Sequence, residues 1–483
     1  MPVAFTLARA KRALLLATIY FGALFFDITY VIPLLVPDLA RLRGYNELQK
    51  NVVTAASGVG AYAMLPIFGM LSDRYGPHWV ALVGAAMYFT GYYSLAALYG
   101  DQPFATSYQV AVMFSFILGL AGSSMAAAYS TFITQEARPA LRGIMLGAWM
   151  AMLTLSSSVF AFIERWFVDT SNGRIDMQAF LSTMAYICAG LGALVTFGMY
   201  WRPPGDVLNA DKTDDDTVII CEGPDNTDID ELSPLLHCID KGAEQSLEHC
   251  TPNRMAIFKD VAFILLCIAL SIFVGSVGVY ANNVSSLARR LLLKQNPNAT
   301  KDQIHSVEVL HPQLISLANS AAYITIGVLS GQLAKRMRHS EHLFLLLAAL
   351  LTTLAHVFAI FVEHLGTLVL ISILEGIGTG SFGLAAALLC VEAWGSAYYA
   401  FNYGLIMVAL AIAGQVFGAL FGFLVDRAIS QPTGCDGRHC YTAGFTLLCV
   451  MCIVGLCALV GAIWRLQRAK DHGCTQTSRR ADA

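Results

Sequence analysis

The chain has 483 residues, of which 56% are hydrophobic and only 13% are charged. Soluble domains carry about 25% charged residues, so this chain has too few charges to cover the surface of a soluble protein of its length. Its formal net charge is -3, which excludes the strongly basic surface of a nucleic-acid-binding protein. Composition therefore indicates a membrane protein with no nucleic-acid partner.

The apolar residues gather in twelve blocks, each near the roughly 20 residues that a helix needs to cross a bilayer. The first block is too long for the apolar part of a signal peptide, so we expect it to span the membrane. The predicted fold class is an all-α integral membrane protein with twelve transmembrane helices. The predicted spans are residues 13–36, 51–71, 79–99, 108–134, 143–163, 180–200, 256–281, 312–334, 342–362, 366–391, 403–425 and 441–464.

A polar stretch separates the sixth predicted helix from the seventh. Its run of acidic residues with few aromatics is typical of a mobile linker. The predicted domains are an N-terminal six-helix bundle at 1–201, a cytoplasmic acidic linker at 202–255, a C-terminal six-helix bundle at 256–465 and a cytoplasmic tail at 466–483.

Two short patterns inside the linker carry no assignment. His237–Cys238 and His249–Cys250 form two His–Cys pairs, but their spacing matches no standard zinc site. The string Glu231–Leu236 is similar to an acidic dileucine sorting signal, which chance produces at least as readily. We therefore expect no metal and no cofactor.

Basic residues give the predicted orientation. With the N-terminus inside, the inner segments hold 19 of the 30 Lys and Arg residues and the outer segments hold 11. Because Lys and Arg are enriched in cytoplasmic loops, we expect both termini in the cytoplasm. The membrane is expected to be the plasma membrane or a vacuole- or lysosome-like membrane. Two glycosylation sequons then lie outside, and Asn298 is more accessible than Asn283, which lies close to the membrane.

The cysteines divide by environment. Cys435 and Cys440 lie in the last outer loop, where oxidising conditions favour a local disulfide between them. The cysteines within apolar helices are expected to act as small hydrophobic residues. They are Cys188, Cys267, Cys390, Cys449, Cys452 and Cys457.

The two halves of the chain contain similar strings at equivalent places. Gly69 follows the second predicted helix and Gly331 follows the eighth, 262 residues later. Gly143 begins the fifth helix and Gly404 begins the eleventh, 261 residues later. This constant offset indicates a duplicated six-helix unit, an arrangement found in parallel-repeat transporters.

One loop resembles a known family. Gly69, Asp73, Arg74 and Gly76 are similar to the major facilitator signature between helices two and three. Other strings resemble the nodulin-like branch, which is related to the fungal monocarboxylate-transporter homologues. They are Gly76-Pro77, Gly91-Tyr92, Glu392-Ala393-Trp394-Gly395, Asn402-Tyr403-Gly404 and Cys435 to Cys440.

The resemblance covers about residues 16–465 outside the linker. It implies a facilitator fold of two six-helix bundles with alternating access, but it does not define the substrate. Two departures from the family pattern concern the charged loops after helices two and eight, which are candidate parts of a gate between the bundles. Pro77 and His78 replace the usual basic residues, and Lys335 stands where the second motif often has an acid. The gate is therefore better supported in the first half.

Two carboxylates lie inside predicted helices, where charge is costly and usually functional. Asp27 lies in helix one and Glu375 in helix ten, both near mid-depth. Because desolvation disfavours a charged carboxylate, each is a candidate proton carrier or cation ligand. The alternative is a carboxyl group that only holds neighbouring helices together by hydrogen bonds.

Uncharged polar residues could complete a substrate or proton site. Tyr30 lies three residues after Asp27 and so on the same helix face. Asn319 in helix eight and Gln415 in helix eleven are further candidates, and a packing hydrogen bond is the open alternative for each.

The predicted spans contain no Lys or Arg apart from Lys259 at an edge. A site for a permanent anion would normally offer a fixed cation. The sequence therefore favours a neutral or cationic solute, or an anion carried with a proton. His356 is interpreted as a packed polar residue rather than a ligand.

A charge cluster at the inner helix ends predicts a gate. Asp73 and Arg74 are expected near Arg142, where they could latch the two halves in one state. The alternative is that these charges only anchor the helices at the inner membrane surface.

The predicted function is secondary active transport of a small polar solute, with proton coupling left open. The alternative is a transporter-like sensor that binds solute without turnover. The chain lacks the Gly-x-x-x-x-Gly-Lys-Ser/Thr string of ATP-driven proteins and shows no catalytic constellation, so we expect no enzyme. The expected partners are the solute, protons and the lipid bilayer, with the protein acting as a monomer.

Overall fold

The computed structural model describes residues 16–26, 31–45, 47–100, 107–137, 139–167, 176–200, 254–333, 340–396, 398–430 and 437–481. Within these ranges all regular structure is helical and no strand is present. The helices are α2 (Val31–Arg43), α3 (Glu47–Ala63), α4 (Leu65–Tyr75), α5 (Pro77–Ala97), α6 (Tyr108–Glu136), α7 (Pro139–Glu164), α8 (Met177–Tyr200), α11 (Val261–Gln295), α12 (Lys301–Leu333), α13 (Ser340–Ile360), α14 (Leu365–Trp394), α15 (Tyr399–Ile429) and α16 (Thr442–Ala481), with short 3₁₀ helices η2 (Arg165–Phe167), η3 (Arg254–Lys259) and η4 (Gly437–Cys440).

Ten helices in the described part of the chain are long and apolar enough to cross a membrane. One of them, Val52–Tyr75, joins α3 to α4, and α7 adds a shorter apolar segment, Leu141–Ser156. The first predicted helix appears in part, as a helical segment at 16–23 and as α2. Together these account for the twelve predicted helices of a multi-pass membrane protein.

The first helix is not continuous, which differs from the predicted span 13–36. The amides of Leu24, Phe25 and Phe26 donate to carbonyls three residues earlier, at 3.2, 2.9 and 3.4 Å, so the helix tightens. The carbonyl of Phe26 accepts a hydrogen bond from the Tyr88 hydroxyl, and that of Phe25 accepts one from the Cys188 thiol at 3.3 Å. Side chains of α5 and α8 therefore bind the backbone carbonyls at this point.

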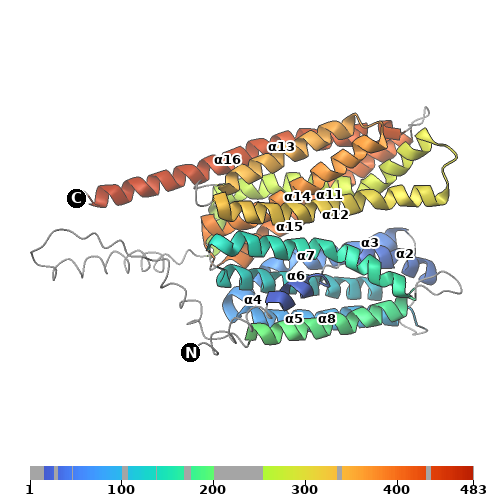
Figure 1. The fold of residues 1–483 in the computed structure, drawn as a ribbon, viewed down its shortest axis with the longest axis horizontal. Coiled ribbons are helices and arrows are strands. Elements are labelled where there is room, and N and C mark those ends of the chain that lie inside the picture. The colour runs from blue at the N-terminus through green and yellow to red at the C-terminus, as the bar shows by residue number, and fades with distance from the viewer. Residues whose placement is uncertain are drawn as a thin grey trace, which may run out of the picture.

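Three helices extend well beyond their predicted ends. α11 has 35 residues and α12 has 33, so each is about 50 Å long, against about 30 Å for the bilayer core. Their yellow hairpin protrudes at the right of Figure 1, while α16 protrudes at the opposite end. The hairpin is held by the Ser285 hydroxyl, which donates to the Glu308 carbonyl at 2.7 Å, and by Arg289, which lies 3.8 Å from the Glu308 carboxylate.

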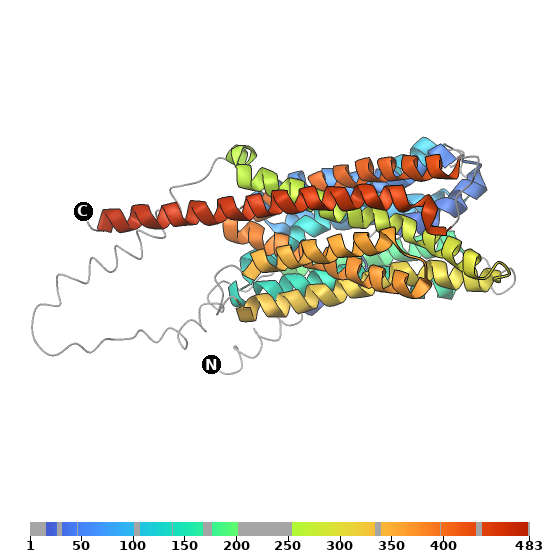
Figure 2. The same cartoon turned by 90° about the horizontal axis from the view of Figure 1, so that it is seen from above.

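The helices form two bundles that lie side by side. Figure 1 shows α2 to α8 in one layer and α11 to α16 in the other, and Figure 2 shows the same elements from above. The layers meet where α4 packs on α15 and where α7 packs on α12. We call the end where α4 meets α5, and from which α16 protrudes, the inner end.

Candidate functional site

At the inner end, the backbones of α4 and α15 touch directly. A Cβ atom on Gly69 would lie 2.5 Å from the carbonyl carbon and oxygen of Ala400. A Cβ atom on Gly404 would lie 2.7 Å from the nitrogen of Pro66. Neither position has room for a side chain, so the two glycines permit this close contact between the bundles.

A second backbone contact joins α7 to α12. A Cβ atom on Gly327 would lie 2.7 Å from the carbonyl oxygen of Gly143, and one on Gly143 would collide with the Ser330 hydroxyl. Further along, the Ser320 hydroxyl donates to the Ala151 carbonyl at 3.3 Å and lies 2.5 Å from the Thr154 hydroxyl. The bundles are thus joined at two places near the inner end.

These two contacts occupy equivalent places in the repeat. Gly404 corresponds to Gly143 by the offset of 261 residues, and Leu65 corresponds to Gly327 by the offset of 262. A Cβ atom on Gly404 would lie 2.9 Å from the carbonyl carbon of Leu65, just as one on Gly327 would meet Gly143. The sequence repeat therefore appears in space as two related contacts.

Charged residues from both bundles gather beside the first contact. The Asp73 carboxylate accepts a weak hydrogen bond from the Phe401 amide at 3.4 Å. Asp73 and Arg142 both interact electrostatically with the Tyr399 hydroxyl, and the half-buried Arg142 has no hydrogen-bond partner for its Nε among the described residues. Arg74 lies apart, exposed, with its guanidinium 5.4 Å from the Tyr75 ring centre.

The predicted gate residues do not all lie together. Asp73 and Arg142 share the neighbour Tyr399, whereas Arg74 takes no part in this cluster. Gly69 forms the close contact, and Gly76 ends α4 with a φ of 95°, a conformation that favours glycine. Sequence reasoning missed Tyr399, because a tyrosine at a helix start carries no motif.

A tyrosine layer lies next to these charges. Tyr399 and Tyr403 of α15 stack with their ring centres 5.5 Å apart. Tyr403 also interacts electrostatically with Tyr62 of α3 and Tyr323 of α12, and its hydroxyl lies 3.4 Å from the Gly383 carbonyl. The rings come from both bundles, so they lie across the boundary between the bundles, beside the glycine contacts.

A second polar group lies within the C-terminal bundle. The Nδ1 atom of His356 on α13 is 2.9 Å from the Glu375 carboxylate on α14 and 2.9 Å from the Thr352 carbonyl. Both side chains are 0% exposed. His356 also interacts with the backbone of Ser276 on α11. Neither Glu375 oxygen accepts a well-aligned hydrogen bond from the described residues, so the carboxylate has His356 as its close neighbour.

Hydroxyl groups extend from this pair. The Tyr280 hydroxyl on α11 is 2.8 Å from the Ser372 hydroxyl, which in turn is 3.1 Å from His311 Nδ1 on α12. Tyr280 interacts electrostatically with Glu375. The group therefore joins side chains of four helices. His356 either has only a packing role, as interpreted from the sequence, or forms part of a polar site with Glu375.

The comparisons with known proteins agree with this architecture. The sequence profile described as Major Facilitator Superfamily matches residues 17–291, more than half of the chain. The chain belongs to the major facilitator superfamily. It is 24% identical over 407 residues to "Probable transporter MCH1" of Wickerhamomyces anomalus, covering 82% of this chain and 76% of the relative. The protein of the same name from Saccharomyces cerevisiae is 21% identical, with 88% and 87% covered.

Solved structures show the same fold. A double-tryptophan mutant of XylE has a TM-score of 0.66 at 15% identity, covering 94% of this chain and 96% of that one. The Escherichia coli fucose:proton symporter FucP has a TM-score of 0.55 at 13% identity, covering 91% and 97%. The predicted facilitator fold of twelve helices in two six-helix bundles is therefore confirmed, and the named relatives are described as probable transporters or as a symporter.

Other predicted site residues of this facilitator are dispersed. Asp27 and Tyr30 lie outside the described residues. Asn319 is 8% exposed and packs against Gly380 of α14, where a Cβ atom would lie 2.8 Å from its side-chain oxygen. Gln415 is exposed on α15.

The outer features lie on the protruding hairpin and the last loop. Asn298 is exposed in the turn between α11 and α12, whereas the Asn283 amide donates to the Val279 carbonyl at 2.9 Å within α11. Cys440 is disulfide-bonded, and its predicted partner Cys435 lies outside the described residues. Arg290 donates to the Cys440 sulfur at 3.5 Å.

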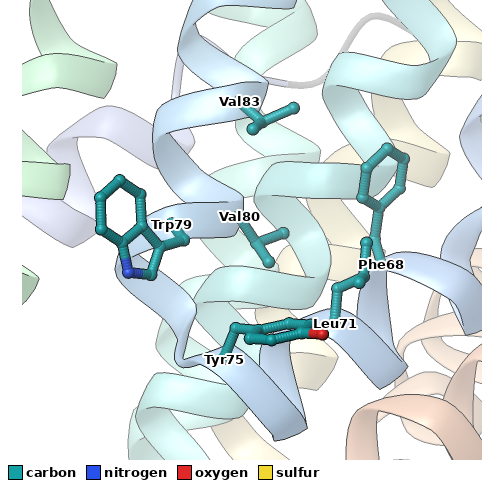
Figure 3. Close-up of a pocket in the computed structure, with 6 residues that line it drawn as sticks. All are labelled: Phe68, Leu71, Tyr75, Trp79, Val80 and Val83. Carbon is teal, nitrogen blue, oxygen red and sulfur yellow. The ribbon is translucent and has the colours of Figure 1, made fainter.

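Two apolar grooves lie on the outside of the bundles. Figure 3 shows the first, of about 330 Å³ between α4 and α5, with Tyr75 and Trp79 at its edge. The second, of about 450 Å³, lies between α11, α15 and α16. Neither contains Glu375 or His356, and their lining is suited to lipid chains rather than to a polar solute.

Proposed function

We propose that this facilitator protein is a secondary active transporter of a small polar solute, and that the structure represents its inner-closed state. Alternating access requires a path that is sealed at one end at a time, with the two bundles moving as units. The observation that carries the proposal is the direct backbone contact of Gly69 and Gly404 with the opposite bundle. The tyrosine layer beside it supports the same seal.

The charges of the interior limit the solute class. Among the described residues, the buried titratable side chains within the C-terminal bundle are histidines, tyrosines, cysteines and Glu375, with no buried Lys or Arg. A permanent anion would lack a fixed partner in such an environment. We therefore propose a neutral or cationic solute, or an anion that moves with a proton.

The orientation and the membrane belong to the same proposal. The excess of Lys and Arg at the inner end supports a cytoplasmic position for that end and for both termini. We place the protein, as a monomer, in the plasma membrane or in a vacuole- or lysosome-like membrane.

The test is accumulation in sealed vesicles. Purified protein in proteoliposomes would be incubated with a metabolite extract under a pH gradient, and the vesicle contents would be compared with those of protein-free vesicles by mass spectrometry. A transporter enriches at least one solute inside, and Gly404→Leu should abolish that enrichment, because the α4–α15 contact cannot re-form. Gly418→Leu is the matched control on the same helix, since a Cβ atom at Gly418 meets nothing within 4 Å. Binding without enrichment would identify a sensor instead.

A further inference from the structure

We infer that His356 and Glu375 together bind the proton that drives transport, and that this proton exchanges with the outer side in the inner-closed state. The inference rests on the proposed function. It assigns the coupling site to the C-terminal bundle and treats the two side chains as one unit.

The hydrogen bonding identifies the atoms that titrate. The Thr352 carbonyl can only accept, so His356 Nδ1 must carry a hydrogen when it forms the 2.9 Å contact. The nitrogen that can gain a further proton is Nε2. The ring also interacts with the Ser276 backbone. The other titratable group is the Glu375 carboxylate, 2.9 Å from Nδ1.

The charge of the pair then depends on one proton. With one proton on Nε2 or on the carboxylate, the pair is neutral overall; with none, it carries one negative charge. An uncompensated charge at a fully buried position is strongly disfavoured. The pair should therefore keep its proton while sealed and exchange it only when water or a hydrogen-bonded path reaches it.

The surroundings offer no fixed cation to replace that proton. The titratable groups facing the pair are Tyr280 from α11 and Cys452 from α16, with His311 of α12 one hydroxyl further away. No Lys or Arg is buried in this region of the described chain. A carboxylate that served only to hold helices would be expected to accept well-aligned hydrogen bonds, whereas neither Glu375 oxygen does so among the described residues.

The polar groups lead toward the outer end. Ser372 lies three residues before Glu375 on α14, on the same face, and connects to Tyr280 and to His311. In the inner direction the next contact between α11 and α14 is apolar: the rings of Phe273 and Phe382 stack with centres 4.9 Å apart, and both are 0% exposed. A proton entering from outside can thus pass through His311, Ser372 and Tyr280, while the aromatic stack blocks the inner side.

The proton step is a simple transfer. His311 is 1% exposed, so water must first reach it from the outer side. A hydronium ion there gives its proton to the chain of His311, Ser372 and Tyr280, and the last group gives a proton to Glu375 or to His356 Nε2, leaving water and a neutral pair. Opening of the inner end later lets water remove the same proton. No oxidant, reductant or other reactant is needed.

Infrared pH titration of the full chain in lipid nanodiscs tests the site without any solute. The wild type should show a carboxyl band and an imidazole band that titrate together. Glu375→Gln should remove the carboxyl band and shift the imidazole titration, and His356→Gln should shift the carboxyl titration. His342→Gln, at a buried histidine of the same helix, should leave both unchanged. If neither band titrates in the wild type, or if the two variants act independently, the inference is overturned.

Solute accumulation in proteoliposomes separates this inference from the proposed function. One coupled proton supports up to about tenfold accumulation of a neutral solute per unit of pH gradient. Glu375→Gln should reduce that ratio to about one while solute exchange continues; full proton-driven accumulation in this variant would refute the coupling role. A wild type that titrates but accumulates nothing would refute the proposed function and leave only a proton-binding site.

A separate variant tests the outer path. Ser372→Ala keeps the pair, so it should slow proton exchange without changing the equilibrium titration. An unchanged rate of proton exchange would refute the outer path.

Discussion

Gly69 lies against the carbonyl group of Ala400, so near that even a methyl group on the glycine would come within 2.5 Å of the carbonyl carbon and oxygen. The contact joins the second helix of the first bundle to the fifth helix of the second bundle. It has no flexible side chain that could move aside, because backbone faces backbone. The two helices therefore either touch or separate, because no side chain can adjust to give an intermediate arrangement.

The first prediction follows from this contact. Gly69→Leu should weaken the inner seal, because forcing a side chain into a packed interface costs about 1–3 kcal/mol, or roughly 5- to 150-fold in the closed population. Hydrogen–deuterium exchange at the start of α15 should become faster. Gly58→Leu on α3 is the control, since a Cβ atom there meets nothing within 4 Å. Equal exchange in both variants would show that the contact does not hold the closed state.

The second prediction concerns the charge at the same end. Asp73→Asn should slow transport several-fold and leave solute binding intact, because it removes the negative charge that faces Tyr399 and the Phe401 amide. Arg74→Gln should have a smaller effect, as Arg74 is exposed and lies beside Tyr75. Transport rates and binding measured on the same preparations distinguish the two. Lost binding with a normal rate in Asp73→Asn would assign the residue another role.

The third prediction concerns the outer brace formed by Arg290. Its guanidinium donates to the Cys440 sulfur and lies 6.0 Å from the Tyr441 ring centre, where burial raises the pKa of the Tyr441 hydroxyl despite the nearby positive charge. Arg290→Ala should destabilise the protein by about 1 kcal/mol, seen as a lower melting temperature. Arg289→Ala should change it less, because Arg289 is mostly exposed and lies 3.8 Å from Glu308. The opposite ranking would contradict the brace.

The fourth prediction tests the orientation. In a eukaryotic host, glycosidase treatment should increase the gel mobility of the wild type and of Asn283→Gln, but not of Asn298→Gln. Asn298 is exposed in a turn, whereas Asn283 donates a hydrogen bond within α11. A shift that persists in Asn298→Gln, or depends on Asn283, would contradict the accessibility argument. Thiol labelling that placed the two termini on opposite faces would contradict the orientation itself.

Hydropathy was sufficient to find the helices but not their ends. Twenty apolar residues mark a span wherever they occur, so the number of helices followed from the sequence alone. The outer half of α11 and the start of α12 carry charged residues such as Arg289 and Asp302. Hydropathy assigns such segments to loops, so the helix ends were missed. The break before Asp27 was also invisible, because Phe25 and Phe26 are as apolar as a continuous helix would be.

The candidate site was only partly accessible from the sequence. Glu375 was conspicuous because a carboxylate in an apolar run is rare. His356 was not, because it lies on another helix and no spacing rule relates the two positions. The repeated glycines were the exception, since the offset of 261 or 262 residues already linked Gly143 with Gly404 and Gly69 with Gly331. The structure added which glycine meets which backbone.

The equivalence of the two glycine contacts has a consequence for the origin of the chain. If a single six-helix ancestor paired with a second copy of itself, the α4–α15 contact and the α7–α12 contact would have been one contact repeated by a twofold axis. Any mutation in that ancestor would have altered both contacts at once. Fusion of two gene copies would have removed this restriction, so that each contact could change alone. The two contacts now differ in their side chains. Charged residues lie around Gly69, whereas the α12 side carries the hydroxyl groups of Ser320 and Ser330. Independent change of the two contacts would produce this difference.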